Sequence, residues 1–149
     1  MTPRYVYVFD LDGTLANLSH RLHLIEQKPK DWDAFFAACL RDSPIWPVIH
    51  VARALAEKHR IAFITGRSEA SRTDTEAWLA WYDLFGRVYM RPRDDHRPDH
   101  IVKPELLSRL ILDLSEDEAV MGIFEDRKTV VDAYRKTGMQ VFQVADGDF

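Results

Sequence analysis

Five short apolar segments recur along the chain, and each has a length suited to one buried strand. Between them, apolar residues return every three or four positions, which is the period of a helix with one buried face. We therefore expect five strands connected by helices. The strands are predicted at residues 6–9, 61–64, 87–90, 119–124 and 140–144, and the helices at about 47–59, 69–84, 104–114 and 128–137.

Alternating strands and helices with short connections predict an α/β fold, a Rossmann-like parallel sheet with helices on both faces. Ligands of such sheets bind beyond the carboxyl ends of the strands. Pro104 suits the first turn of the third helix, and Gly138 suits the end of the fourth. The residues predicted to face the core are Val48, Val51, Ala52 and Leu55 in the first helix, and Ala77, Trp78, Trp81 and Leu84 in the second.

The segment that follows the first strand is predicted to be helical as well. Residues 19–27 can form a helix that Lys28-Pro29-Lys30 ends, and a second helix is expected from Asp31, its N-cap. We predict one domain over residues 1–149 with a small helical insertion at about 17–43. The insertion is either a cap over the mouth of a site or an ordinary core element, and both readings stay open. Its apolar residues are Leu22, Ile25, Trp32, Phe35, Phe36, Cys39 and Leu40.

Composition narrows the class of protein. The 149 residues, 46% of them hydrophobic, are enough for one domain with a proper core. The net charge of -4 argues against a surface that binds nucleic acid everywhere, although a local basic strip remains possible. A single cysteine, Cys39, indicates a reducing compartment. With no leader-like or membrane-spanning segment, we expect a cytoplasmic protein.

Polar side chains with distinct chemistry follow the first strand directly. Asp10 and Asp12 come at its exit, and Gly13 and Thr14 follow them. A buried carboxylate either has a positive partner or becomes neutral, so two of them here indicate a nearby cation, and their hard oxygen atoms suit Mg²⁺. Gly13 allows the backbone to turn toward an anion, and Thr14 adds a hydroxyl group. This stretch therefore predicts a metal and phosphate site at the strand's carboxyl end.

Three later segments carry polar groups at comparable places. Thr65 and Gly66 end the second strand, and Lys103 precedes Pro104, where a cation is unfavourable unless an anion lies nearby. Glu125 and Asp126 end the fourth strand. Each of these signals is weak alone, because strands often end in such residues. Their common position at strand ends predicts that they gather at one edge of the sheet.

Asp10-Leu11-Asp12-Gly13-Thr14 resembles the Asp-x-Asp-Gly-Thr signature of the haloacid dehalogenase (HAD) superfamily of phosphatases. The resemblance implies that Asp10 is the nucleophile, forming an aspartyl-phosphate, and that Asp12 is the general acid. It further implies that Thr65 and Lys103 bind the phosphoryl group and that Mg²⁺ is bound by Asp10, Asp12 and Asp126. Glu125 replaces the aspartate common in relatives, and whether it contacts a metal-bound water or lies farther out stays open.

The chain also resembles, along nearly its whole length, the phosphatase half of bacteriophage polynucleotide kinase/phosphatases. The most specific part is the carboxyl end, residues 127–131, 138, 143–145 and 147–149. The kinase half has no counterpart, since no Gly-x-x-x-x-Gly-Lys-Ser/Thr loop occurs, which implies a stand-alone phosphatase. The residues that the resemblance implies in substrate or phosphate binding, besides Thr65 and Lys103, are Gly66, Arg21, Arg67, Asp99 and Arg127.

These inferences predict a magnesium-dependent phosphomonoesterase, with the 3′-phosphate of a polynucleotide end as the first candidate substrate. A nucleoside monophosphate is the alternative, with the helical insertion closing over it. A hypothesis of another class is a non-catalytic phosphate-binding or regulatory module on the same fold. We expect nucleic-acid ends or nucleotides as binding partners and no membrane, and the sequence indicates no protein partner.

Overall fold

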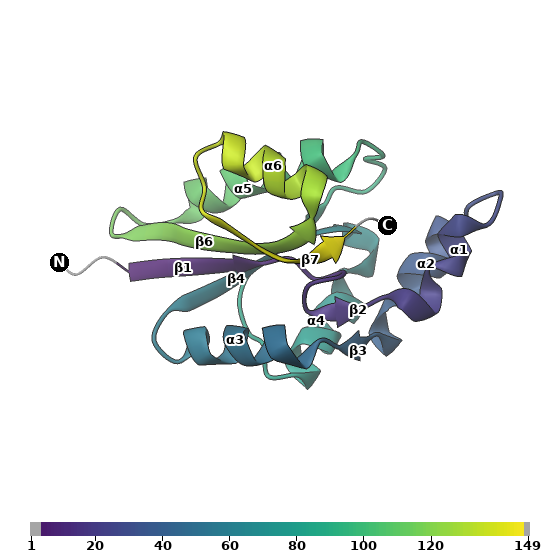
Figure 1. Cartoon of the computed structure of the whole chain (residues 1–149), viewed down its shortest axis with the longest axis horizontal. Coiled ribbons are helices and arrows are strands. Elements are labelled where there is room, and N and C mark those ends of the chain that lie inside the picture. Colours follow the sequence, from purple (N-terminus) through teal and green to yellow (C-terminus); the bar gives the residue numbers. More distant parts are fainter. Residues whose placement is uncertain (1–3, 148–149) are drawn as a thin grey trace.

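A parallel sheet of five strands forms the centre of the computed structural model, which describes residues 4–147 (Figure 1). Its strand order is β5-β4-β1-β6-β7, and every neighbouring pair is parallel. The chain builds one half of the sheet from β1 outward and then returns to the other side of β1, so the order reverses there. Such a reversal opens a crevice at the carboxyl ends of the strands. The strands are β1 (Arg4–Phe9), β4 (Arg60–Ser68), β5 (Val88–Arg91), β6 (Glu118–Arg127) and β7 (Val141–Gly147).

Helices cover both faces of the sheet, as predicted (Figure 1). Val8 of β1 points into a core shared with α5 and α6, whereas the adjacent Phe9 points into a second core shared with α3 and α4. This alternation is the normal consequence of the two-residue period of a strand. The predicted α/β fold is therefore confirmed. The covering helices are α3 (Trp46–Ala56), α4 (Arg72–Trp81), α5 (Asp99–Asp113) and α6 (Lys128–Lys136).

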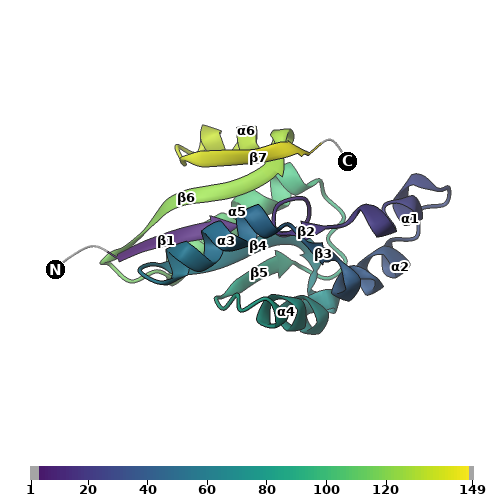
Figure 2. The same cartoon turned by 60° about the horizontal axis from the view of Figure 1, so that its bottom comes forward.

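The segment between β1 and α3 extends beyond the carboxyl edge of the sheet (Figures 1 and 2). Its two ends are joined by the antiparallel strands β2 (Ala16–Asn17) and β3 (Ser43–Pro44), which the sequence pattern did not predict. The Asp31 side chain accepts a hydrogen bond from the Ala34 amide at 3.0 Å and caps α2, as predicted. The helical elements are a 3₁₀ turn (Ser19–Arg21), α1 (His23–Glu26), α2 (Trp32–Ala37) and a second 3₁₀ turn (Cys39–Arg41).

Helix α5 begins five residues earlier than predicted, at Asp99 instead of Pro104. Pro98 provides the extended backbone before the helix, with a ψ of 152°, and Pro104 lies inside it. Pro104 has no amide hydrogen, so the helix lacks one internal hydrogen bond there. The prediction that Lys103 precedes the helix is therefore wrong, because Lys103 belongs to the second turn.

Some predicted core positions on α3 and α4 are exposed. Val51 is exposed, as are Ala77 and Trp81, the latter at 81% of its surface. The buried stripe of α4 is instead formed by Thr75, Trp78 and Leu79, because a helix on a sheet buries only one narrow stripe. Over the residues described, no helix is both long and apolar enough to cross a membrane.

Candidate active site

The chain makes a tight turn directly after β1. The amide of Asp10 still donates to the Phe124 carbonyl of β6 at 2.9 Å, so this residue is fixed by the sheet. The next residues fold back, and the Leu11 carbonyl accepts from the amides of Thr14, Leu15 and Ala16 at 2.9–3.0 Å. Gly13 has a φ of 85°, a conformation that favours glycine. The turn brings the buried Thr14 hydroxyl to 3.0 Å from Asp10 Oδ2.

A buried group of one cation and three carboxylates lies at this strand exit. Lys103 reaches from α5 and donates to Asp10 Oδ1 at 2.9 Å and to Glu125 Oε2 at 2.8 Å. Asp126 Oδ1 lies 3.2 Å from the Thr14 hydroxyl, which also contacts Asp10. Asp10, Glu125 and Asp126 each offer a carboxylate oxygen within 4.8 Å of the others. The four ionisable residues are no more than 3% exposed.

The electrostatics of this group favour the addition of a cation. Burial raises the pKa of Asp10 well above its usual range, and Glu125 raises it further, although Lys103 opposes the shift. Burial also raises the pKa of Asp126 to about 6. For Lys103, burial lowers the pKa, but the charges of Asp10 and Glu125 more than offset this and raise it well above the usual value. Three ionised carboxylates and one ammonium leave two negative charges, which one divalent cation balances.

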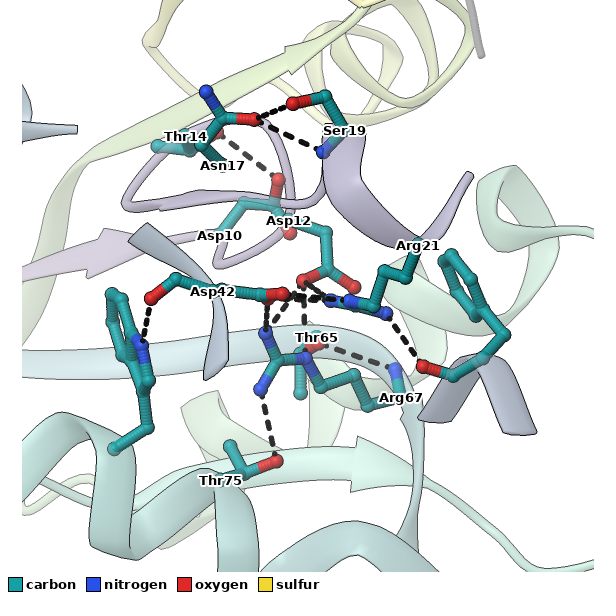
Figure 3. Close-up of polar contacts among 12 residues, drawn as sticks. Asp10, Asp12, Thr14, Asn17, Ser19, Arg21, Asp42, Thr65, Arg67 and Thr75 are labelled. Atoms are coloured by element: carbon teal, nitrogen blue, oxygen red, sulfur yellow. Dashed lines mark hydrogen bonds and ion pairs between the residues drawn. The ribbon is translucent and has the colours of Figure 1, made fainter. Parts of the chain in front are cut away.

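Asp12 lies apart from that group and is held by two arginines (Figure 3). Arg21 Nη2 donates to Asp12 Oδ1 at 2.8 Å, and Arg67 donates to the same oxygen from Nη2 at 2.6 Å and Nε at 3.1 Å. Burial alone would raise the pKa of Asp12, but the charges of Arg67 and Arg21 outweigh it and lower the pKa. The two acids of the motif therefore have different environments, although they are two residues apart.

Asp42 is a member of the site that sequence reasoning missed. It lies at the far end of the segment between β1 and α3, and its side chain is fully buried. It accepts from Arg21, at 2.8 Å to Oδ1 and 2.6 Å to Oδ2, and from Arg67 at 3.0 Å to Oδ2. No local motif surrounds this residue, so only its spatial partners identify it.

A third part of the site joins the end of β4 to the start of α5. A Cβ atom at residue 66 would overlap the Asp99 carboxylate, so Gly66 permits this close approach. Asp99 accepts hydrogen bonds from Arg91 and, at 3.1 Å, from Arg127. The buried Thr65 hydroxyl accepts from the Arg67 amide at 3.1 Å.

The strand ends, the start of α5 and the 3₁₀ turn that contains Arg21 bring the predicted site residues to one edge of the sheet in three sets. Lys103 and Asp126 lie with Asp10, Arg21 and Arg67 lie with Asp12, and Gly66 and Arg127 lie with Asp99. The predicted metal ligands are not all together. The third carboxylate beside Asp10 and Asp126 belongs to Glu125, while that of Asp12 lies on the arginines.

This fold, with two acids after the first strand and two further acids at the carboxyl end of β6, belongs to a phosphatase of the HAD type. A haloacid dehalogenase-like family protein from Streptococcus pneumoniae superimposes with a TM-score of 0.67 and 17% identity, covering 96% of this chain and 85% of that one. At that level of identity the match shows the fold. Within the class, the chain belongs to the family described as the polynucleotide kinase PNKP phosphatase domain, whose model matches residues 4–149. The predicted family is thereby confirmed.

Two relatives carry this domain within longer chains. A protein of Autographa californica nuclear polyhedrosis virus, described as a bifunctional polynucleotide kinase/RNA ligase, is 32% identical over 133 residues. The match covers 87% of this chain and 17% of the viral protein. A chain in the structure of the Pnkp1/Rnl/Hen1 complex is 29% identical with a TM-score of 0.80, covering 99% of this chain and 48% of that one. The present chain thus spans half or less of these relatives.

Proposed function

We propose that this phosphatase is a magnesium-dependent phosphomonoesterase that removes 3′-phosphates from polynucleotide ends through an intermediate on Asp10. The observation that carries the proposal is the pair of carboxylates at the exit of β1, which are held in different ways. Asp10 lies against Lys103 among buried acids, whereas Asp12 lies against two guanidinium groups. Two acids in separate environments suit a two-step transfer, one as the nucleophile and one as the proton carrier.

In the first step, an Asp10 carboxylate oxygen bonds to phosphorus while the bond from phosphorus to the ester oxygen breaks. Asp12 gives its proton to that departing oxygen, and the product leaves as an alcohol. Arg21 and Arg67 keep Asp12 ionised in the free protein, since they lower its pKa. A phosphate dianion approaching the same arginines opposes their effect and lets Asp12 take up the proton that it later donates.

In the second step, water attacks the phosphorus of the phosphorylated Asp10, and the bond between phosphorus and the carboxylate oxygen breaks. Asp12 accepts the proton of that water, and inorganic phosphate leaves from Asp10, which is again a free carboxylate. Once the phosphate has left the two arginines, Asp12 loses its proton to solvent and returns to its ionised state. Thr65 and Lys103 donate to the equatorial phosphoryl oxygens in both steps, where negative charge is spread. Gly66 and Asp99 shape the wall of the site beside Arg127, which contributes positive charge toward the substrate.

The donor set fits magnesium. Asp10, Glu125 and Asp126 present oxygen atoms only, and their charge exceeds that of Lys103 by two. These three residues would hold the ion, which would polarise the phosphoryl group and offset its charge. The carboxylate of Asp12 contacts the two arginines, so Asp12 acts as the proton carrier and its side chain is not one of the metal ligands.

Magnesium should therefore stabilise the fold more at pH 8 than at pH 5. The pKa of Asp126, about 6, is above its ordinary value of 3.8, so between these two pH values the metal-free folded state holds a proton that the unfolded chain has lost. The stability of the metal-free protein therefore falls as pH rises through this range. Magnesium must displace the same proton in order to bind. With magnesium at 100 times its Kd at pH 8, we expect the Tm to rise by about 5–10 °C at pH 8, and by much less at pH 5 with the same magnesium concentration.

Differential scanning calorimetry with and without magnesium at both pH values measures this effect. Asp126→Asn should abolish the shift, whereas Asp132→Asn, at an exposed ion pair with Lys128, should keep it. An equal shift at pH 5 and pH 8 would count against binding at the buried carboxylates.

We also propose that residues 17–43 form a cap that belongs to the site. Arg21 lies near the beginning of this segment and Asp42 near its end, and the two form a buried ion pair at 2.6 Å. Because Arg21 also contacts Asp12, the segment completes the environment of a catalytic acid. The aromatic residues of α2 pack on one another beside this ion pair, with the Phe35 ring 4.3 Å from the Arg21 guanidinium.

The polynucleotide substrate is supported by the family and by positive charge beyond the site. Arg93 follows β5 by two residues, at the carboxyl edge of the sheet, and it is exposed. A 3′-phosphorylated oligonucleotide offers neighbouring phosphates to this charge, and a mononucleotide offers none. We expect a KM for the oligonucleotide at least about fivefold below that of the matching nucleoside 3′-monophosphate, with the gap narrowing as salt rises.

Phosphate release from both substrates at several salt concentrations measures the difference. Arg93→Ala should raise the KM of the oligonucleotide without changing kcat, because distant phosphate contacts act on binding alone. Arg97→Ala is the matched control, since Arg97 is already paired with Asp95 and Glu105 at 2.8 and 2.7 Å. Equal KM values for both substrates would favour a mononucleotide as the natural substrate. The absence of activity on both would overturn the proposal that the protein is a phosphomonoesterase.

A further inference from the structure

Each oxygen of the Asp42 carboxylate has two polar contacts with neighbouring side chains. Oδ1 accepts from Arg21 Nε and pairs with His20 Nε2 at 2.7 Å, while Oδ2 accepts from Arg21 Nη2 and Arg67 Nη2. Its main-chain carbonyl accepts from Trp78 Nε1 at 2.9 Å. A carboxylate with four contacts from three side chains around its two oxygens has little freedom to move. Asp42 is thus a rigid anchor within the site.

The same guanidinium atoms that contact Asp42 also contact Asp12. Arg21 Nη2 lies 2.6 Å from Asp42 Oδ2 and 2.8 Å from Asp12 Oδ1, and Arg67 Nη2 lies 3.0 and 2.6 Å from these two atoms. Figure 3 shows the guanidinium groups of both arginines beside the two carboxylates, with dashed lines to each. With two cations and two anions, this network is balanced in charge.

The network distinguishes the two oxygens of Asp12. All hydrogen bonds that residues 4–147 donate to its carboxylate fall on Oδ1. Oδ2 is the oxygen left for a proton and for a substrate, and the Asp12 side chain is 17% exposed. An oxygen that exchanges protons with a leaving group must be held in place without being occupied by another donor.

We propose that Asp42 is a positioning residue, which holds Arg21 and Arg67 so that they clamp one oxygen of Asp12 and present the other to the leaving group. Asp42 touches neither the substrate nor the reacting atoms, and it acts through the two arginines. The inference rests on the proposed function, because it concerns how the general acid of that reaction is oriented. It also assigns a role to a residue outside every motif of the chain.

The test compares two substrates that need the general acid to different extents. A 3′-phosphorylated oligonucleotide has an alkoxide leaving group that requires a proton, whereas p-nitrophenyl phosphate has a leaving group that requires little help. Asp42→Asn should lower kcat on the oligonucleotide by about 10- to 100-fold and on p-nitrophenyl phosphate by less than about threefold. In an Asp12→Asn background, Asp42→Asn should have little further effect, because the oriented group is already gone.

A purely structural role would give another result. Trp78→Phe removes the hydrogen bond to the Asp42 main chain and keeps the carboxylate, so it should lower the Tm while leaving the ratio of the two activities unchanged. Equal losses on both substrates in Asp42→Asn, or losses that multiply with those of Asp12→Asn, would overturn the inference. If Asp42→Asn does not fold, as judged by circular dichroism, Asp42→Glu keeps the charge, displaces the carboxylate and should show the same selective loss. A wild-type protein inactive on both substrates would instead refute the proposed function.

Discussion

Asp10→Asn should reduce turnover by at least about 10⁴-fold on every phosphate ester while leaving the fold intact. The amide has the shape of the carboxylate, but its neutral oxygen does not attack phosphorus. Phosphate release under single-turnover conditions measures the loss. Because the nucleophile is needed whatever the leaving group, p-nitrophenyl phosphate should be affected as strongly as an oligonucleotide. This behaviour separates Asp10 from Asp12 and from Asp42.

The stability of the same variant gives independent information. Burial and Glu125 raise the pKa of Asp10, so its charge is less favourable in the folded protein than in the unfolded chain. Removing that charge leaves Lys103 paired with Glu125 at 2.8 Å. The Tm of Asp10→Asn in the absence of metal should therefore equal or exceed that of the wild type at pH 7.

Two observations complete this prediction. Acid quenching during turnover of a ³²P-labelled substrate should trap label on the wild-type protein, sensitive to hydroxylamine as an acyl phosphate is, and should trap none on Asp10→Asn. Asp132→Asn, an aspartate in an exposed ion pair, serves as the control with full activity. Retention of more than a few per cent of wild-type turnover in Asp10→Asn would exclude Asp10 as the nucleophile.

The proximity of Asp10 and Asp126 was predictable from the sequence, because both residues lie at the carboxyl ends of strands. Parallel strands meet with their carboxyl ends at one edge, so the polar groups at the carboxyl ends of β1 and β6 must lie together. The contact of Lys103 with Asp10 does not follow from that rule, and the predicted position of Lys103 before a helix was wrong. Lys103 does not precede a helix, but points inward from the second turn of α5, where Val102 and Leu106 pack on the sheet.

The arginine network was not predictable in its detail. Arg21 and Arg67 were recognised only through family resemblance, and their contacts with Asp42 join positions 21 and 25 residues apart. No periodicity or motif encodes such a contact, since it depends on how the segment after β1 returns through β2 and β3. The exposure of Trp81 has a similar origin, because α4 ends there and the packing of its neighbours decides which face is buried.

Lys103→Met should destabilise the fold by about 3–5 kcal/mol at pH 8, because it leaves buried carboxylates without their cation. The methionine fills a similar volume, so the loss reports charge more than packing. Lys103 has a raised pKa, so in the wild type its contribution is fully present below about pH 10 and is lost only as pH rises further. The charge of the Lys103 ammonium therefore does not vary between pH 5 and pH 8.

The variant, in contrast, should recover part of its stability at pH 5. Without the ammonium group, Asp10, Glu125 and Asp126 repel one another, and protons taken up at acid pH relieve that repulsion. Urea unfolding at pH 5 and pH 8 measures this difference in stability. The turnover of Lys103→Met should also fall by at least about 10³-fold, because the phosphoryl oxygens lose a hydrogen-bond donor. Lys128→Met is the matched control: Lys128 pairs with Asp132 at 2.8 Å but is 75% exposed, so its loss should cost less than about 1 kcal/mol. A destabilisation by Lys103→Met that is equal at both pH values, or as small as that of Lys128→Met, would show that this lysine does not neutralise the buried acids on which the proposed chemistry depends.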